Sequence, residues 1–147
     1  KSSHGTGIEP DYDAGKFSTT RPGQDDLLIF PGGLPGSSNL AADSRLMECL
    51  KEHWSVGGKV AAICAAPGLV LAGTLGNRLS GRRMTCYPGF EDKLEKAGAT
   101  ATGERVVVGG NLITGKGPGA ALEFGLAILS ELKGAQAALE VKNGMLV

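Results

Sequence analysis

The sequence predicts an α/β domain built on a mostly parallel sheet. Short apolar runs, typical of strands buried on both faces, alternate along the chain with longer segments that have helical spacing. Glycine supplies 24 of the 147 residues, against a usual share of about 7%, and these glycines separate the apolar runs as tight turns would. Strands that alternate with helices form a sheet covered on both faces. We therefore expect one domain over residues 1–147, with an irregular stretch at 1–24.

Composition narrows the possible partners. Fifteen basic and fifteen acidic side chains give a net charge of zero, whereas nucleic-acid and membrane-surface binding require a clustered positive charge. The longest uncharged run lies between Lys59 and Arg78 and contains Pro67 and three glycines, which favours a strand, a turn and a helix over a membrane span. We expect no nucleic-acid partner and no membrane partner.

The first half of the chain predicts two buried strands, each leading to a helix. Residues 26–30 form an apolar run that ends at Pro31-Gly32-Gly33. Asp43 is a suitable N-cap for a helix that runs to Trp54 and ends before a glycine pair. Residues 60–63 predict the next strand, and Pro67 suits the first turn of the helix after it.

The second half predicts three more strands and two helices. Residues 84–86 indicate a short strand, and residues 90–97 a charged helix. Strands at 105–108 and 111–114 should form a hairpin through their glycine-rich turn. An amphipathic helix is expected over residues 118–132.

Cys64 is the main candidate for a reactive residue. Ligands of open α/β sheets bind at the carboxyl ends of strands, and Cys64 stands where a buried strand turns into a helix. Amide groups and the positive end of a helix dipole favour a thiolate there, and a sharp elbow leaves amides free to bind an oxyanion. The alternative is a structural cysteine, because free cysteine is often buried in cores.

Other turns could complete this site. Gly32 and Gly33 follow the first buried strand and can bring an amide close to a ligand, although glycine pairs also form plain turns. Cys86 ends the predicted short strand and could line the same pocket. Cys49 falls within a helix and is expected to have a structural role.

The remaining cysteines and glycines argue against metals and nucleotides. Three cysteines without a C-x-x-C spacing predict neither a disulfide framework nor a zinc site. They favour a reducing compartment, which we take to be the cytoplasm. Gly110, Gly115 and Lys116 match a phosphate-binding loop in spacing, but Gly117 replaces the Ser or Thr that holds magnesium, and residues 112–113 resemble a strand. We expect no metal and no cofactor.

Several motifs in order give the sequence a family resemblance. From about residue 25 to residue 132 it resembles the ThiJ/PfpI superfamily, in the branch of the Parkinson-disease protein deglycase. The resemblance rests on four segments: Pro31-Gly32-Gly33, Ala61 to Pro67, Thr85 to Gly89 and Gly117 to Phe124.

The resemblance implies a flavodoxin-like three-layer sandwich, usually a homodimer, with an oxidation-sensitive cysteine at Cys64. It implies an anion pocket formed by amides at Gly33 and Ala65, beside Gly32, and Tyr87 and Pro118 are possible lining residues. The implied activities are the glutathione-independent conversion of methylglyoxal and glyoxal to hydroxy acids, the repair of glycated proteins, and redox sensing or chaperone action in oxidative stress. The enzyme would be of the lyase or hydrolase type, with a small aldehyde or a glycated protein as substrate.

The sequence departs from the family pattern at two points. The family glutamate that hydrogen-bonds to the cysteine has no counterpart here. We therefore expect the chain to lack a first strand-helix unit of about 40 residues, which a separate N-terminal peptide held without covalent bonds could supply. Tyr87 stands where some relatives have a histidine.

These features support a catalytic mechanism and one alternative function. The Cys64 thiolate would add to an aldehyde, the Gly33 and Ala65 amides would hold the oxyanion, a carboxylate outside this chain would move the proton, and water would release a 2-hydroxy acid. In the rival function, a non-catalytic sensor or chaperone, the same thiolate is oxidised. A class I glutamine amidotransferase is excluded because no histidine follows Cys64.

Overall fold

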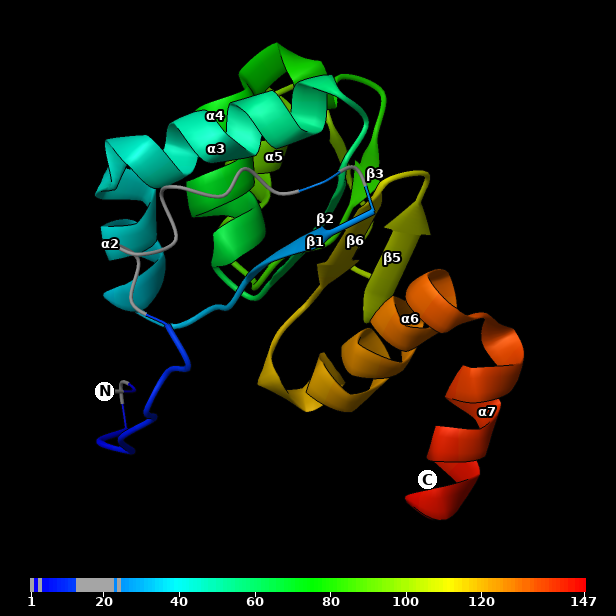
Figure 1. Cartoon of the computed structure of the whole chain (residues 1–147). Coiled ribbons are helices and arrows are strands. Elements are labelled where there is room, and N and C mark those ends of the chain that lie inside the picture. The colour runs from blue at the N-terminus through cyan, green and yellow to red at the C-terminus, as the bar shows by residue number, and fades with distance from the viewer. Residues whose placement is uncertain (1, 3, 13–22, 24) are drawn as a thin grey trace.

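A four-stranded sheet forms the centre of the computed structural model, which describes residues 2, 4–12, 23 and 25–147 (Figure 1). The strand order is β1-β2-β6-β5, with parallel pairing from β1 to β6 and an antiparallel β5. The bounds of these strands are Leu27–Phe30, Lys59–Ile63, Leu112–Gly115 and Val106–Gly109, respectively. This sheet confirms the predicted α/β class.

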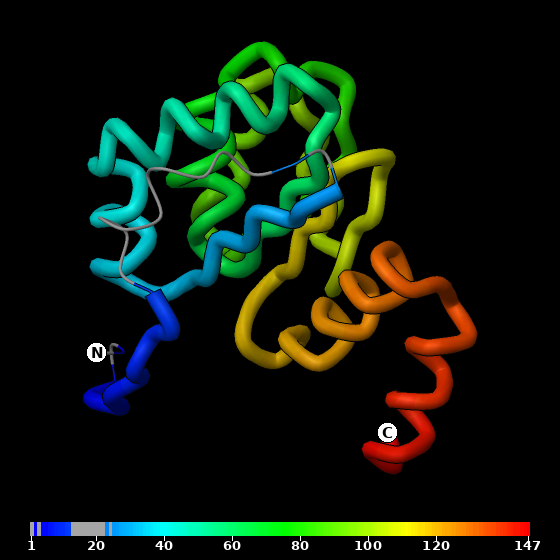
Figure 2. Tube along the Cα trace, viewed as in Figure 1, coloured from blue at the N-terminus to red at the C-terminus, as the bar shows by residue number. Residues whose placement is uncertain are grey.

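Helices cover the sheet on both sides, and a second, two-stranded parallel sheet lies beside it. The path of the chain is followed in Figure 2. The α-helices are α2 (Gly36–Ala42), α3 (Ser44–Ser55), α4 (Gly73–Leu75), α5 (Glu91–Lys96), α6 (Ala121–Lys133) and α7 (Ala135–Gly144). A π-helical segment, η1 (Pro67–Ala72), and two 3₁₀ segments, η2 (Gly76–Leu79) and η3 (Pro118–Ala120), complete the helices, and β3 (Arg83–Met84) and β4 (Thr100–Ala101) form the small sheet.

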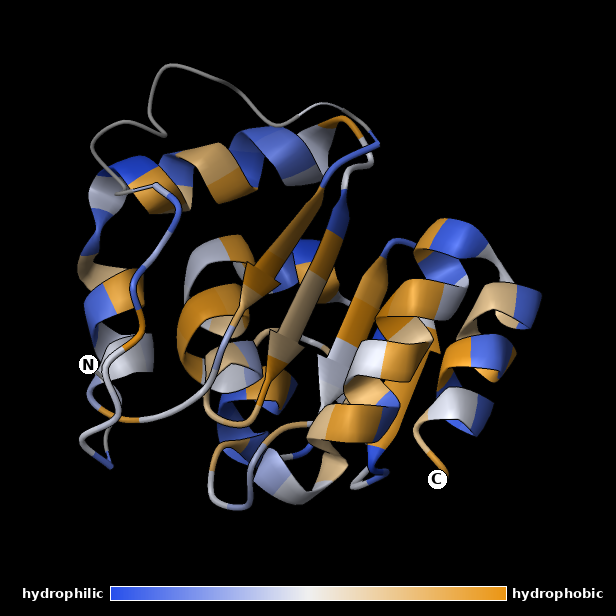
Figure 3. Ribbon diagram, turned by 60° about the horizontal axis from the view of Figure 1, so that its bottom comes forward, coloured by the Kyte–Doolittle hydropathy of each residue, from blue (hydrophilic) through white to orange (hydrophobic). Residues whose placement is uncertain are grey.

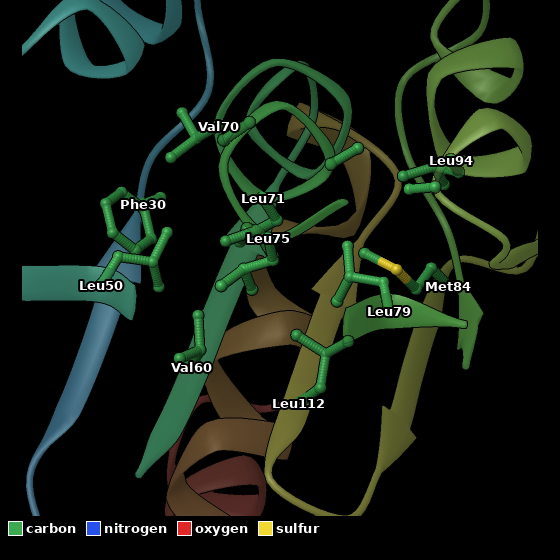
Figure 4. Packing of buried hydrophobic residues seen from close by; sticks show 14 of the residues in the cluster. Phe30, Leu50, Val60, Val70, Leu71, Leu75, Leu79, Met84, Leu94 and Leu112 are labelled. Atoms are coloured by element: carbon green, nitrogen blue, oxygen red, sulfur yellow. The ribbon is translucent and has the colours of Figure 1, made fainter. Parts of the chain in front are cut away.

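Alternation along the strands produces two apolar layers. Successive side chains of a strand point to opposite faces, so Ala62 and Val60 of β2 join the larger cluster while Ala61 joins the smaller one. The larger cluster packs β1, β2 and β6 against α3, η1 and α4 (Figure 4). The smaller cluster packs Ala61 and Ile113 against Phe124 of α6. Apolar residues accordingly dominate the strands in Figure 3.

Most of the predicted elements are confirmed. The Asp43 side chain accepts hydrogen bonds from the amides of Arg45 and Leu46 and caps α3 as expected. The hairpin of β5 and β6 turns at Gly110, which has a φ of +63°. Of the irregular start expected at 1–24, residues 2, 4–12 and 23 are exposed and form no helix or strand, and the rest lie outside the described residues.

Other elements differ from the prediction. The strand expected at 84–86 is wrong beyond Met84, because the Thr85 amide donates to the Thr114 side chain and the chain leaves the strand there. The helix after Cys64 starts as a π-helix, and α2, α7 and β4 were not expected.

The interior of the main sheet has no gap, because β1, β2 and β6 pair directly in register. The outer edge of β1 pairs with no described strand.

Gly58 provides a test of the packing under α3. His53 is buried, its Nε2 lies 2.9 Å from the Lys59 carbonyl oxygen, and a Cβ at Gly58 would lie 2.2–2.4 Å from the atoms of its ring. We expect Gly58→Ala to lower the free energy of unfolding by about 1–3 kcal/mol, since an overpacked core must shift. Urea unfolding measures this change.

Gly73 is the matched control. Its φ is −65° and a Cβ there would meet nothing within 4 Å. Gly73→Ala should leave stability unchanged or raise it by up to about 1 kcal/mol, because alanine favours helix. Equal stability for the two variants would show that Gly58 is not needed for the packing of His53.

Candidate active site

The backbone of Cys64 adopts a conformation that few residues other than glycine adopt. Cys64 directly follows β2, and its φ is +66°. Its amide donates to the Gly115 carbonyl oxygen at 2.9 Å, and its own carbonyl oxygen accepts from the Tyr87 amide at 2.8 Å. Because such a conformation costs about 1–3 kcal/mol, it persists only where the surroundings impose it. The two hydrogen bonds hold Cys64 from both sides.

The residues after Cys64 keep the turn compact. Ala65 and Ala66 are buried, and the Ala65 carbonyl oxygen accepts from the Leu69 amide at 2.9 Å. Between described residues, no turn hydrogen bond uses the amide of Ala65. Half-buried Cys64 therefore stands at the start of a helical turn beside an amide without a partner in these turns.

The glycine turn after β1 lies directly against Cys64. A Cβ added at Gly32 would lie 2.4 Å from the Cys64 Cβ and 3.1 Å from its Sγ. Gly33 has a φ of +89°, and its carbonyl oxygen accepts from the amide of Ser37 at 2.8 Å. Only glycine fits at position 32, which brings the β1 turn into contact with the sulfur.

The segment after β3 forms another wall. The buried Thr85 amide donates to Thr114 Oγ1 at 3.0 Å, which fixes this segment to β6. Cys86 is buried, whereas Tyr87 is 46% exposed. The Tyr87 ring lies against Gly117, where a Cβ would be 3.2 Å from its Cδ2. Pro118 begins η3 next to Gly117 and is exposed.

Two charged side chains, Glu91 and Lys116, lie close enough to Cys86 to affect its pKa. The pKa of Cys86 is raised to about 11, mainly by burial and also by the negative charges of Glu91 and Cys64, while the Phe90 amide and Lys116 act in the opposite direction. Hydrogen bonds from its own amide and from the amide of Gly89 lower the pKa of Glu91. Cys86 is therefore a neutral thiol at neutral pH, in electrostatic contact with Cys64.

The fold thus brings together much of the expected site. Gly32, Cys64 and Ala65 meet at the ends of β1 and β2, and Tyr87 joins them through its amide. The lining role of Pro118 stays a prediction. The residues that the sequence interpretation missed are Phe90, Glu91 and Lys116. Two features of the sequence could have pointed to them: the hydrophilic start of α5, and Lys116, which the rejected phosphate-loop motif contains.

Cys49 lies in a helix outside this site. Cys49 lies in α3, as expected, and burial and Glu52 raise its pKa. Within the described ranges, no group of three or more His, Cys, Asp or Glu side chains could hold a metal ion. The same residues include no helix long and apolar enough to cross a membrane.

The fold and this elbow define a class: α/β proteins that present a cysteine between a central strand and a helix. Residues 1–131 match the model of the DJ-1/PfpI family, and the chain belongs to that family. It is 41% identical over 122 residues to Protein DJ-1 homolog A of Arabidopsis thaliana, a match that covers 83% of this chain and 31% of that protein.

Two further comparisons point the same way. The chain is 39% identical over 109 residues to the glutathione-independent glyoxalase DJR-1.2 of Caenorhabditis elegans, covering 74% of this chain and 56% of that protein. The crystal structure of Drosophila melanogaster DJ-1beta superposes with a TM-score of 0.86 at 37% identity, covering 99% of this chain and 75% of that one. The chain thus spans about a quarter to two thirds of the length of the curated relatives it matches.

Backbone strain at Cys64 leads to a test of stability. Both Cys64→Ala and Cys64→Gly remove the sulfur, but only glycine adopts a φ of +66° without strain. We expect the glycine variant to be more stable than the alanine variant by about 1 kcal/mol, although glycine normally loses stability through unfolded-state entropy. Urea unfolding of both variants measures the difference. A more stable alanine variant would contradict a strained elbow.

Proposed function

We propose that this protein is a cysteine-dependent, glutathione-independent glyoxalase and deglycase that acts on methylglyoxal-type aldehydes, with Cys64 as its nucleophile. The left-handed backbone of Cys64 carries this proposal, since that conformation is costly and presents the sulfur at the head of a helical turn. The similarity to a glyoxalase of Caenorhabditis elegans supports the choice of reaction.

The first step is addition of the thiolate to the aldehyde carbon. A carbon–sulfur bond forms, and the electron pair of the carbonyl moves to its oxygen. The amides of Gly33 and Ala65, which take part in no turn hydrogen bond between described residues, would donate to this oxyanion. The tight fit of Gly32 against Cys64 keeps the two turns together.

The second step converts the adduct to product. A base carries the proton of the former aldehyde carbon to the neighbouring carbonyl carbon, so that one carbon is oxidised and the other reduced. The result is a thioester of a 2-hydroxy acid. Water then cleaves the carbon–sulfur bond, releases the 2-hydroxy acid and regenerates the thiol. The reaction consumes no external oxidant or reductant.

The same nucleophile explains an action on glycated proteins. An aldehyde adduct on a cysteine, lysine or arginine side chain is in equilibrium with the free side chain and free aldehyde, and the carbonyl carbon of the released aldehyde is open to the same thiolate. Half-buried Cys64, with exposed Tyr87 beside it, suits a small aldehyde or an adduct at the end of a flexible side chain.

The proposal predicts that methylglyoxal turnover depends on Cys64 alone among the cysteines. Cys64→Ser should lower kcat/KM at least about 100-fold, because a hydroxyl is far less ionised than a thiol at neutral pH. Formation of lactate from methylglyoxal without glutathione is the assay.

Cys49→Ser is the matched control, since Cys49 lies in α3 outside the site. This variant should keep the activity of the parent chain. Full turnover in Cys64→Ser, or equal losses in the two variants, would contradict the assignment of the nucleophile.

A further inference from the structure

Cys86 is a second thiol beside the nucleophile, and the proposed reaction does not use it. It is only 3% exposed and lies in the larger apolar cluster, behind exposed Tyr87. A valine or serine would fill this position without the chemistry of a thiol. Its proximity to Cys64 therefore raises the question of a reaction between the two sulfur atoms.

A backbone hydrogen bond brings the chain segments that carry the two cysteines next to each other. The Tyr87 amide donates to the Cys64 carbonyl oxygen at 2.8 Å, which is one of the two bonds that parallel pairing of Cys64 with Cys86 would form. With standard peptide dimensions, this bond keeps the two Cα atoms within about 7.5 Å. Disulfides need a Cα separation of about 4.4–6.8 Å, which lies within this limit, so the backbone hydrogen bond is compatible with a disulfide between the two residues.

The two thiols also interact electrostatically, because the charge on Cys64 affects the pKa of Cys86. The charge of Cys64 contributes to the raised pKa of Cys86, whereas Lys116 lowers it. Oxidation of the Cys64 thiolate to a neutral sulfenic acid removes the repulsive charge and leaves the Lys116 ammonium in place. Loss of that charge removes one of the causes that raise the pKa of Cys86 and so favours its thiolate, while burial, the largest cause, remains.

We propose that Cys86 is the resolving thiol of Cys64, and that a hydroperoxide converts the pair to an intramolecular disulfide. The Cys64 thiolate attacks the peroxide, takes one oxygen atom and becomes a sulfenic acid, and the peroxide leaves as an alcohol or water. The Cys86 sulfur then attacks the Cys64 sulfur, and the sulfenic oxygen leaves as water. The two thiols lose two electrons and two protons in total.

This inference rests on the reactive Cys64 of the proposed function and adds a regulatory reaction to it. A sulfenic acid that meets no thiol proceeds to sulfinic acid, which is irreversible for most proteins. A disulfide stops that progression and is reduced again by small thiols. The disulfide form has no free nucleophile and would be inactive toward aldehydes until it is reduced.

Peptide mapping after peroxide treatment tests the proposal on the whole chain. Trypsin places Cys49, Cys64 and Cys86 on separate peptides, 46–51, 60–78 and 84–93. With one equivalent of hydrogen peroxide, we expect monomeric protein that has lost two hydrogen atoms and a linked pair of peptides 60–78 and 84–93. Dithiothreitol should restore both peptides.

Variants separate resolution from over-oxidation. In Cys86→Ser, Cys64 should proceed to sulfinic acid, a gain of two oxygen atoms, in a several-fold larger fraction than in the parent chain. Cys49→Ser is the matched control and should form the same disulfide as the parent. The peptide map of the parent chain decides the proposal even if Cys86→Ser does not fold.

The outcomes distinguish this proposal from the proposed function. Sulfinic Cys64 without linked peptides at one equivalent of peroxide, or a link from Cys64 to Cys49 or to a second chain, would overturn the role of Cys86. Turnover of methylglyoxal by the reduced chain is measured in parallel. Its absence would contradict the glyoxalase function and leave the disulfide result to stand on its own.

Discussion

The site depends on one constraint, the left-handed backbone of Cys64. The Cys64 amide donates to the Gly115 carbonyl oxygen, and the Cys64 carbonyl oxygen accepts from the Tyr87 amide. Gly115 belongs to β6, and Tyr87 lies in the segment after β3. The main sheet fixes the first partner, and the hydrogen bond of Thr85 to Thr114 fixes the second. A strained residue is thus held on one side by β6, whose residues are all buried, and on the other by a segment tied to β6, and such surroundings can sustain strain.

This constraint also explains the glycines around the sulfur. With Cys64 turned toward the end of β1, the residue at position 32 can have no side chain, since its Cβ would meet the Cys64 Cβ at 2.4 Å. Gly33, with a φ of +89°, then turns the chain away into α2. The close approach of the Gly32 backbone to the Cys64 sulfur follows from the same geometry.

The sequence predicts the strands and the position of the elbow, because these depend on local patterns. An apolar run that ends in a Pro-Gly-Gly turn marks β1, and an apolar run that leads through Cys64 to Pro67 marks β2 and the elbow.

Elements that depend on tertiary packing were missed. α2 begins with Gly36 and two serines, which are weak helix formers, and α7 buries no residue of its own. η1 packs closely against Phe90, since a Cβ added at Gly68 would lie 2.9 Å from the Phe90 Cβ, a contact that the local sequence does not reveal. The same holds for the charges near Cys86, since Glu91 and Lys116 meet only when the sheet has formed.

The central claim is that the elbow makes Cys64 a reactive thiol. Competition among the three cysteines for a limiting alkylating reagent tests it most directly. The native, reduced chain is treated with iodoacetamide at neutral pH, and the label on each cysteine peptide is quantified. Cys49 and Cys64 are both half-buried, so accessibility alone predicts similar labelling. The elbow predicts that Cys64 reacts at least about tenfold faster than Cys49, because the thiolate is the reactive species. Labelling of Cys49 at an equal or higher rate would contradict the account.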